Sequence, residues 1–274
     1  MNPSLQQKFE ALKSQMRGYK SVVVAFSGGI DSSLVAYIAA QELGELALAV
    51  TSGSPSLKRS DLALTEALAP KWGMRHRVII TDELQKADYR ANPTNRCFHC
   101  KTSLYDALRR IADEEGFKHI VNGTNCDDLG DHRPGLIAAD NQFVKSPLVD
   151  ARFCKQEIRD LAEHIGLENA QKPQAACLSS RFPYGSHITL ARLRQVESAE
   201  EVLADLGFRQ YRVRHHEDVA RLEIATDELA KALQLRDTIT ERIKSCGYRF
   251  VALDLDGFRS GSLNEGVIKV VNVG

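Results

Sequence analysis

The sequence predicts an α/β protein in which a doubly wound parallel sheet precedes a smaller α+β domain. Three observations predict this fold. Short apolar, β-branched runs alternate with helical patterns through the first half of the chain, a glycine-serine turn directly follows one of these runs, and the alternation stops near residues 172–187. Alternating strands and helices are typical of a parallel sheet with helices on both faces. We therefore expect a larger domain over 1–172 and a smaller one over 173–274.

The elements of the first domain follow from the spacing of the apolar residues. An amphipathic stretch from Met1 to Lys13 predicts an opening helix. No clean period covers 81–101, where Pro93 and two nearby asparagines indicate a turn-rich insertion. Further strands are expected at 21–26, 46–51, 77–81 and 119–122, and further helices at 32–43, 61–72 and 104–115.

Two more irregular stretches, 125–147 and 172–185, follow the last of these strands. Like the insertion at 81–101, whose length is typical of loops that carry function, they have no clean period. Beyond them the chain changes pattern, which favours a small α+β domain. That domain is expected to hold helices at 188–207 and 226–246 and strands at 211–215, 221–225 and 250–255.

The composition excludes several classes of protein. The 36 basic side chains balance the 36 acidic ones, so no overall field draws the chain onto nucleic acid or a membrane surface. The first residues lack the apolar core of a signal peptide, and no apolar run approaches the roughly 18 to 20 residues of a membrane span. We therefore expect a cytoplasmic protein whose six cysteines are reduced, so that close pairs among them indicate metal or redox chemistry.

The strongest functional signal is a loop between the first buried strand and the next helix. Its glycines let the backbone approach an anion, while its serines and the free N–H groups of the helix end donate to phosphate oxygens. The sequence lacks both the Gly-Lys-Ser/Thr ending of the nucleotide P-loop and the dinucleotide fingerprint. The alternative is a capped helix after a glycine turn. The loop reads Ser27-Gly28-Gly29-Ile30-Asp31-Ser32-Ser33.

This loop resembles the motif of the PP-loop ATP pyrophosphatases, which split ATP between the α and β phosphates and adenylate an oxygen of the substrate. The resemblance implies that the chain uses ATP with Mg²⁺. It also implies that Ser52, after the second strand, lies near adenine, and that Gly123 and Thr124, after the fourth, lie near the ribose and α-phosphate. These positions agree with the rule that ligands bind at the carboxyl ends of parallel strands.

Three cysteines are candidates for chemistry. Cys97 and Cys100 form a C-x-x-C pair in the expected insertion, and Cys177 lies at the expected domain junction. A lone C-x-x-C is equally compatible with half a zinc site or a dithiol. Three thiolates holding a [4Fe–4S] cluster would leave one iron free to bind an extra sulfide. The remaining cysteines are expected to be structural, the one that follows the nucleotide loop being the least secure: Cys126, Cys154 and Cys246.

Further motifs extend the resemblance over nearly the whole chain and point to the LarE family of ATP-dependent sulfur transferases. The resemblance implies a pyridinium mononucleotide substrate with two carboxylates, adenylated and then converted to a thiocarboxylate in nickel-pincer cofactor biosynthesis. The sulfur comes either from one sacrificial cysteine, matched by Cys177, or from a cluster held by three. Because Cys97 and Cys100 are present, the chain looks like the three-cysteine version. The motifs are Ser27 to Ser33, Asn122 to Asn125, Asp131 to Leu136, Cys177 to Arg181, Arg212 to Arg214 and Gly257 to Asn264.

A compact polyanion of this kind needs fixed cations. Arg212 and Arg214 are two apart on a predicted strand and so face the same side, where guanidinium groups can bind carboxylate or phosphate in bidentate fashion. We expect Arg259 to join them and Glu223 to orient them by ion pairing, unless all are ordinary exposed strand charges. Ser180 and Arg181, next to Cys177, are expected to contact the α-phosphate or the substrate. By the resemblance, Glu200 matches a metal-binding acid, although a solvated helix face explains it equally well.

Three rival functions use similar features. A tRNA thiolase would share the loop and the cysteines but should carry a basic RNA-binding surface. An amidating synthetase would use ammonia and would not need Cys177. A zinc- or nucleotide-binding regulatory module would bind ATP without releasing pyrophosphate. We expect a small nucleotide substrate, no nucleic acid or membrane partner, and assembly as a homo-oligomer.

Overall fold

The computed structural model describes residues 1–129, 134–173, 176–259 and 261–264, which fall into two compact units, Met1–Ala176 and Cys177–Gly274. Each unit is described by itself. The division follows Ala176, so Cys177 is the first residue of the second unit. Of the motifs named above, residues 131–133 and 260 lie outside the described residues.

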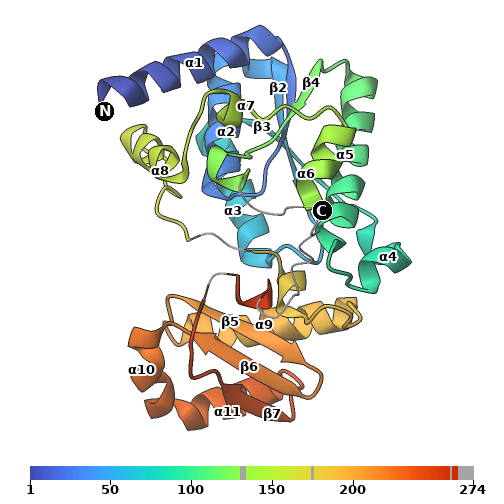
Figure 1. The fold of residues 1–274 in the computed structure, drawn as a ribbon, viewed down its shortest axis with the longest axis vertical. Helices are drawn as coiled ribbons and strands as arrows, with labels where there is room; N and C mark the ends of the chain where they lie inside the picture. Colours follow the sequence, from blue (N-terminus) through green and yellow to red (C-terminus); the bar gives the residue numbers. More distant parts are fainter. Residues whose placement is uncertain (130–133, 174–175, 260, 265–274) are drawn as a thin grey trace, which may run out of the picture. The chain divides into compact units, whose positions relative to one another are not determined.

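The first unit is built on a four-stranded parallel sheet with the order β3-β2-β1-β4; Figure 1 labels three of these strands. Its central strand pairs on both sides, Val24 lying opposite Ala49 on β2 and Val121 on β4. The strand order reverses between β1 and β4, and ligands of open α/β sheets bind at the carboxyl ends of strands at such a point. The strands are β1 (Val22–Ala25), β2 (Ala47–Ser52), β3 (Arg75–Ile79) and β4 (His119–Val121).

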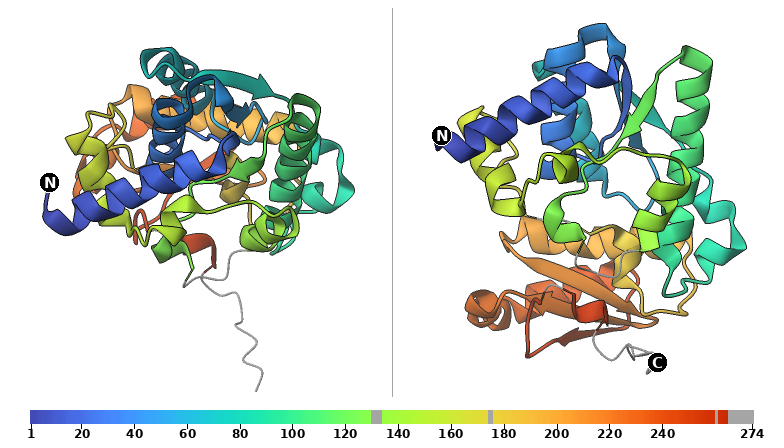
Figure 2. Two further views of the ribbon diagram at one scale, coloured as in Figure 1. Left: turned by 90° about the horizontal axis from the view of Figure 1, so that it is seen from above. Right: turned by 45° about the horizontal axis from the view of Figure 1, so that its top comes forward.

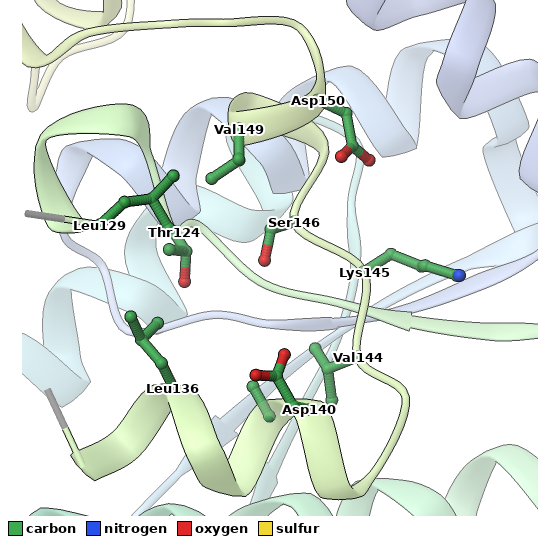
Figure 3. Close-up of a pocket in the computed structure, with 10 residues that line it drawn as sticks. Thr124, Leu129, Leu136, Asp140, Val144, Lys145, Ser146, Val149 and Asp150 are labelled. Atoms are coloured by element: carbon green, nitrogen blue, oxygen red, sulfur yellow. The ribbon is translucent and has the colours of Figure 1, made fainter.

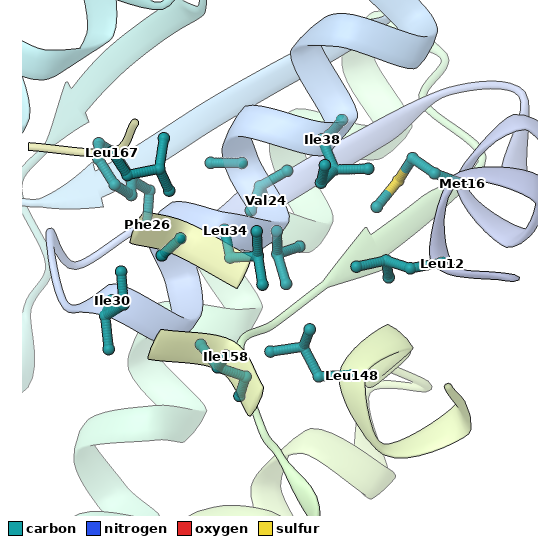
Figure 4. Close-up of a cluster of buried hydrophobic side chains, with 14 of the residues drawn as sticks. Leu12, Met16, Val24, Phe26, Ile30, Leu34, Ile38, Leu148, Ile158 and Leu167 are labelled. Atoms are coloured by element: carbon teal, nitrogen blue, oxygen red, sulfur yellow. The ribbon is translucent and has the colours of Figure 1, made fainter. Parts of the chain in front are cut away.

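Helices cover both faces of this sheet, which confirms the predicted fold class. Val22 and Val24 pack with α1, α2, α3 and α8 on one face, whereas Val23 packs with α5 and α6 on the other. Figure 2 shows α1 and α5 on opposite sides, and Figure 4 shows the first of these cores. The helices are α1 (Pro3–Tyr19), α2 (Ile30–Leu43), α3 (Arg59–Lys71), α4 (Ala87–Arg90), α5 (Arg96–Glu115), α6 (Pro134–Asn141), α7 (Pro147–Asp150) and α8 (Lys155–His164).

The second unit contains a three-stranded mixed sheet of order β5-β6-β7. Strands β5 and β6 form an antiparallel hairpin, and β7 pairs parallel to β6. Helices α9 and α11 pack on this sheet around Leu203, Val213 and Ile243. The elements are α9 (Leu190–Asp205), β5 (Tyr211–His216), β6 (Val219–Ile224), α10 (Leu229–Gln234), α11 (Arg236–Ser245) and β7 (Phe250–Leu253).

Two predicted segments differ from the structure. The expected helix over 226–246 is divided into α10 and α11 at Leu235, whose backbone leaves the helical conformation. The expected irregular insertion over 81–101 ends early, because α5 already begins at Arg96. Within the described ranges, no helix is both long and apolar enough to cross a membrane.

Candidate active site

The loop after β1 is organised by its own hydroxyl groups. The Ser32 Oγ accepts from the Ser27 backbone N–H at 3.2 Å, lies 3.1 Å from the Ser27 Oγ and donates to the Gly29 carbonyl at 2.9 Å. Gly28 has a φ of +71°, and a Cβ at this position would stand 2.9 Å from the Thr65 Cγ2. The loop therefore requires glycine here for both backbone conformation and space.

The N-terminus of α2 is open toward the carboxyl end of the sheet. Gly29 is its N-cap and supplies no side chain to cap it, so the amide groups of the first turn can receive an anion. Gly123, just after β4, lies directly against this helix end, since a Cβ there would come within 2.5 Å of the Ser32 backbone nitrogen. The Thr124 N–H donates to the Asn122 Oδ1 at 3.0 Å, which holds the turn after β4 in place.

Asp31, in the first turn of α2, is bound from two directions. The Lys155 Nζ forms an ion pair with its Oδ2, and the Asn125 Nδ2 donates to its Oδ1 at 3.3 Å. Lys155 is the first residue of α8, and its own backbone N–H donates to the Asp127 Oδ2 at 2.6 Å. The negative side chain of the loop is thus neutralised in the free protein.

Two residues that follow α8 contact the Gly28 carbonyl of the loop. The Asn169 Nδ2 donates to the Gly28 carbonyl at 3.0 Å and to the Ser33 Oγ at 2.8 Å. The Lys172 Nζ forms an ion pair with the Asp61 Oδ1 at 2.7 Å and lies 3.5 Å from the same Gly28 carbonyl. Sequence reasoning missed Asn169, Lys172 and Lys155, because no local pattern connects them to a loop more than a hundred residues away.

Ser52 ends β2 at the same edge of the sheet. Its Oγ lies 2.7 Å from the Thr81 Oγ1, so the two hydroxyls join the ends of β2 and the segment after β3. The neighbouring Thr51 Oγ1 lies 2.8 Å from the His76 Nε2. Burial lowers the pKa of His76, an effect that Glu66 partly opposes, so this imidazole acts as a neutral hydrogen-bonding group.

A cavity of about 340 Å³ lies beside Thr124 in the first unit. Figure 3 shows Thr124, Asp140 and Ser146 directing oxygen atoms toward its interior, whereas Lys145 points away. This volume falls within the range of small-ligand sites. Its remaining lining residues are mostly apolar: Leu129, Leu136, Ala139, Val144, Val149 and Asp150.

Cys97 and Cys100 lie in the first two turns of α5, so the prediction that they belong to an irregular insertion is wrong. Residues three apart on a helix share a face, and both side chains are at least partly accessible. The Arg96 Nη2 lies 3.9 Å from the Cys97 Sγ. Within the part of the chain that the structure describes, no group of three or more His, Cys, Asp or Glu side chains could hold a metal ion.

In the second unit, Cys177 precedes a short 3-10 turn, Leu178–Arg181, that fixes its backbone. The Cys177 carbonyl accepts from the Ser180 Oγ at 2.8 Å and from the Arg181 Nη1 at 3.3 Å. The Arg181 Nη1 also donates to the Ser180 Oγ at 2.9 Å. Cys177 itself is partly buried.

The guanidinium of Arg181 is buried in a bidentate ion pair with Glu200 on α9. The two side chains are 3% and 2% exposed, and the second oxygen of this pair lies 3.2 Å from the Arg181 Nη2. The Val213 N–H also donates to Glu200 at 3.1 Å. Burial lowers the pKa of Arg181, but Glu200 and, less strongly, the charges of Cys177 and Glu223 raise it overall. Glu200 is therefore no solvated helix residue, and its expected metal role remains a prediction.

Arg214 forms a second buried pair, its Nη2 lying 2.9 Å from the Glu223 Oε2, as expected for the orienting role of that carboxylate. The Arg214 Nη1 donates to the Ser180 carbonyl at 2.6 Å. Both Glu223 oxygens are occupied, since Arg221 and Ser262 also donate to them. The turn that begins with Cys177 is thus fixed by two arginines, each bound to its own carboxylate.

Arg212 differs from these two arginines. Its Nη1 donates to the Arg259 carbonyl at 3.0 Å and its Cζ lies 4.5 Å from the Phe258 ring centre, but no carboxylate among the described residues pairs with it. Burial, and then the charges of Arg181 and Arg214, lower its pKa to about 10. At 9% exposure Arg212 is not an ordinary surface charge. The charges of Glu223 and Glu200 partly oppose this lowering of the pKa, so the described part of this unit holds a buried cation that is near carboxylates but in no ion pair with them, which suits an anion.

The chain is similar to known proteins both over its first unit and over nearly its whole length. Residues 7–129, which hold the loop and all four strands of the first sheet, match the asparagine synthase family. The chain is 38% identical to an uncharacterised protein of Synechocystis sp., over 97% of this chain and 100% of that one. It is 35% identical to the pyridinium-3,5-bisthiocarboxylic acid mononucleotide synthase of Lactiplantibacillus plantarum, over 97% of each chain. A glutamine-hydrolysing GMP synthase of Latilactobacillus sakei is 23% identical over 61% of this chain and 35% of that one.

Proposed function

The chain belongs to the LarE family of the PP-loop superfamily, and from that premise we propose that it is an ATP-dependent sulfur transferase acting on a pyridinium dicarboxylate mononucleotide. It adenylates a carboxylate of this substrate and converts that carboxylate to a thiocarboxylate. The match to the Lactiplantibacillus plantarum synthase spans both units of the chain. The weaker match to a GMP synthase covers 61% of the chain and gives no support to an amidating reaction over the remainder.

One observation carries the proposal. Within the second unit, the guanidinium of Arg181 lies near both Cys177 and Arg212, the arginine that forms no ion pair with a described carboxylate. Arg181 donates a hydrogen bond to the Cys177 carbonyl, and its positive charge lowers the pKa of Arg212. The turn that carries Cys177 is therefore fixed by the buried ion pairs of Arg181 and Arg214, next to the cation of Arg212, which leaves little backbone freedom to be lost when a substrate binds. This is the arrangement needed to bring sulfur to a bound carboxylate.

In the first step, a carboxylate oxygen attacks the α-phosphorus of ATP, and the bond between that phosphorus and the bridging oxygen breaks. Pyrophosphate leaves with the electron pair, and an acyl-adenylate remains. The first-turn amides of α2 stabilise the charge on the phosphates. The cavity beside Thr124 is suited to the ribose.

Mg²⁺ fits the donors present at this loop. It commonly binds proteins through one or two carboxylates together with substrate phosphates. Asp31 provides such a carboxylate in the first turn of α2, where the phosphates are expected. When bound there, the ion would offset the negative charge that develops on the departing pyrophosphate.

In the second step, sulfur attacks the acyl carbon and the bond to the AMP oxygen breaks, so AMP leaves with its electron pair. If Cys177 is the donor, its Sγ forms a thioester. Removal of the Cys177 α-proton then expels the sulfur with the product and leaves dehydroalanine in the chain.

A cluster is the second possible source of sulfur. The soft thiolates of Cys97, Cys100 and Cys177 are of the right kind for a [4Fe–4S] cluster, and the first two share one face of α5. With three ligands such a cluster would present a sulfide on its open iron. We propose this version because Cys97 and Cys100 are present, and single-turnover transfer from Cys177 is the alternative.

Two measurements test the proposed function. Cys177→Ala should abolish thiocarboxylate formation while substrate-dependent release of pyrophosphate continues; unchanged transfer would remove Cys177 from the reaction. The intact mass of the protein before and after one turnover distinguishes the two donors. Loss of the elements of H₂S identifies Cys177 as the donor, whereas an unchanged mass, with iron and sulfide in anaerobically purified protein, supports the cluster.

A further inference from the structure

Two of the cysteines that we expected to be structural lie on neighbouring segments of the first unit. Cys126 begins the 3-10 turn that follows β4, and Cys154 is the last residue before α8. The Cys126 backbone N–H donates to the carbonyl of Phe153 at 3.0 Å. One residue further along each segment, the Lys155 N–H donates to the Asp127 Oδ2 at 2.6 Å. The two segments therefore lie side by side, with the two cysteines at matching places.

The bond between Cys126 and Phe153 places the two cysteines within reach of a disulfide. Cys126 carries the donating nitrogen on its own Cα, and one peptide bond joins the accepting carbonyl to Cys154. With ordinary bond lengths the two Cα atoms lie within about 7 Å of each other, the upper limit for a bridge that needs no backbone movement. The thiols are also close enough for their charges to interact. Burial raises the pKa of Cys126, Lys8 opposes this, and the charges of Asp127 and Cys154 add to it.

Neither cysteine is fully buried, so a small oxidant can reach both. Cys154 occupies the N-cap of α8, a position where a serine, threonine, aspartate or asparagine side chain stabilises a helix better than a thiol does. The Cys126 Sγ makes only a long contact, 3.9 Å from the Val149 carbonyl. Capping and hydrogen bonding therefore give no reason for a thiol at either position.

We propose that Cys126 and Cys154 form a reversible disulfide when the protein meets hydrogen peroxide. One thiolate attacks a peroxide oxygen, the O–O bond breaks, and a sulfenic acid forms while hydroxide leaves and takes up a proton. The second thiolate attacks the sulfenic sulfur, the S–O bond breaks, and a second hydroxide leaves as water. Two electrons pass from the two sulfurs to the peroxide, and a dithiol such as dithiothreitol returns them. This inference goes beyond the proposed function and does not depend on it.

The bond would close a ring of the chain that contains α6 and α7 and borders the loop after β1. On one side of the bond Asn125 donates to Asp31, and on the other Lys155 forms an ion pair with the same carboxylate. Because a cross-link restricts the unfolded chain more than the folded one, the oxidised protein should be the more stable form. Disulfides in cytoplasmic proteins are usually transient and respond to the redox state, which agrees with the expected compartment.

The first test identifies the bond. Purified full-length protein is treated with a small excess of hydrogen peroxide, its remaining thiols are alkylated, and it is digested without reductant. Mass spectrometry should find the peptides of Cys126 and Cys154 joined, with two hydrogen atoms lost, and dithiothreitol should separate them. Cys126→Ser and Cys154→Ser should each abolish this product. Cys246→Ser is the matched control, because Cys246 is also partly buried but lies in the second unit, and it should leave the product unchanged.

Thermal denaturation distinguishes a bond that fits the folded protein from one that distorts it. The unfolding temperature of the wild type should rise by about 5 °C or more on oxidation and return with dithiothreitol, and neither serine variant should show this rise. Free thiols at both positions after oxidation, or an oxidised wild type that melts at the same or a lower temperature, would overturn the inference. Failure of the proposed function would appear separately, as protein that releases no pyrophosphate with the dicarboxylate substrate, because neither test uses ATP.

Discussion

The guanidinium of Arg181 forms a bidentate ion pair with the carboxylate of Glu200, with the Arg181 Nε 2.8 Å from one oxygen and the Nη2 3.2 Å from the other. This pair joins the turn that carries Cys177 to the buried face of α9. The backbone of β5 takes part as well, through the Val213 N–H. The position of the Cys177 backbone therefore depends on a buried ion pair.

Removing the negative charge of that pair should destabilise the protein. Glu200→Gln leaves the Arg181 guanidinium buried without a counter-charge, which costs about 3 to 5 kcal/mol of the free energy of unfolding. Urea denaturation followed by circular dichroism measures the change. Glu217→Gln is the control: it breaks an exposed ion pair with Arg192 and should cost less than about 1 kcal/mol. If the two variants were equally stable, the loss of Glu200 would not leave the Arg181 guanidinium as a costly buried charge, and the prediction would be wrong.

Gly123 should tolerate no side chain. The Cβ of Gly123→Ala would stand 2.5 Å from the Ser32 backbone nitrogen, so the turn after β4 must move away from the α2 N-terminus. A displacement of about 1 Å at a reacting group can cost about 100-fold in rate, and we expect a loss of this order in pyrophosphate release. Gly18→Ala, with no atom within 4 Å of its new Cβ, should leave the rate unchanged. A fully active Gly123→Ala protein would show that this contact is unimportant.

The stability of the protein should fall on the acid side of neutrality. His215 is 2% exposed, its Nδ1 lies 3.1 Å from the Tyr248 hydroxyl, and burial lowers its pKa. Because the unfolded chain binds this proton more readily, the contribution of His215 is complete above a pH of about 6.5 and is lost as the pH falls through the folded-state pKa. His215→Phe should therefore lose less free energy of unfolding between pH 7 and pH 5 than the wild type. An identical slope would exclude His215 as the cause.

The fold was predictable because its signals are local. Strand runs such as 22–25 are apolar on both faces, and the glycine turn after them marks the start of α2. The beginning of α5 was not predictable from the sequence, because Pro93 and Asn92, which has a positive φ, lie just before it and its first turn is largely polar. The amphipathic pattern of α8, with Ile158, Leu161 and Ala162 buried, is present in the sequence, although no helix was expected there.

The candidate site was predictable in part. Arg212 and Arg214 were expected to share one side of a strand, and both do contribute to one buried charged cluster. Their different pairing was not predictable, since it depends on which of them meets Glu223 across the hairpin. Strand register places Arg212 opposite Glu223, yet the carboxylate binds Arg214. Side-chain direction, which the sequence does not encode locally, decides this outcome.

The two arginines should therefore respond in opposite ways to the same substitution. Arg214→Gln removes the buried partner of a carboxylate that is 1% exposed and leaves it only Arg221 and Ser262, so it should cost about 3 kcal/mol of the free energy of unfolding, the lower end of the range for a broken buried pair. Arg212→Gln removes a buried cation that no carboxylate among the described residues neutralises and that Arg181 and Arg214 repel. It should leave stability unchanged or raise it.

Activity should show the reverse contrast for Arg212. If this cation is kept to bind a substrate anion, Arg212→Gln should raise KM for the dicarboxylate substrate by at least about tenfold, the loss of a charge-assisted hydrogen bond. The turnover of bound substrate should change much less. Thermal denaturation and steady-state kinetics on the same preparations check both halves. An Arg212→Gln protein that is less stable and equally active would mean that Arg212 stabilises the fold and does not bind the substrate. A residue that is kept for binding usually costs the free protein stability, so its removal should not lower the free energy of unfolding.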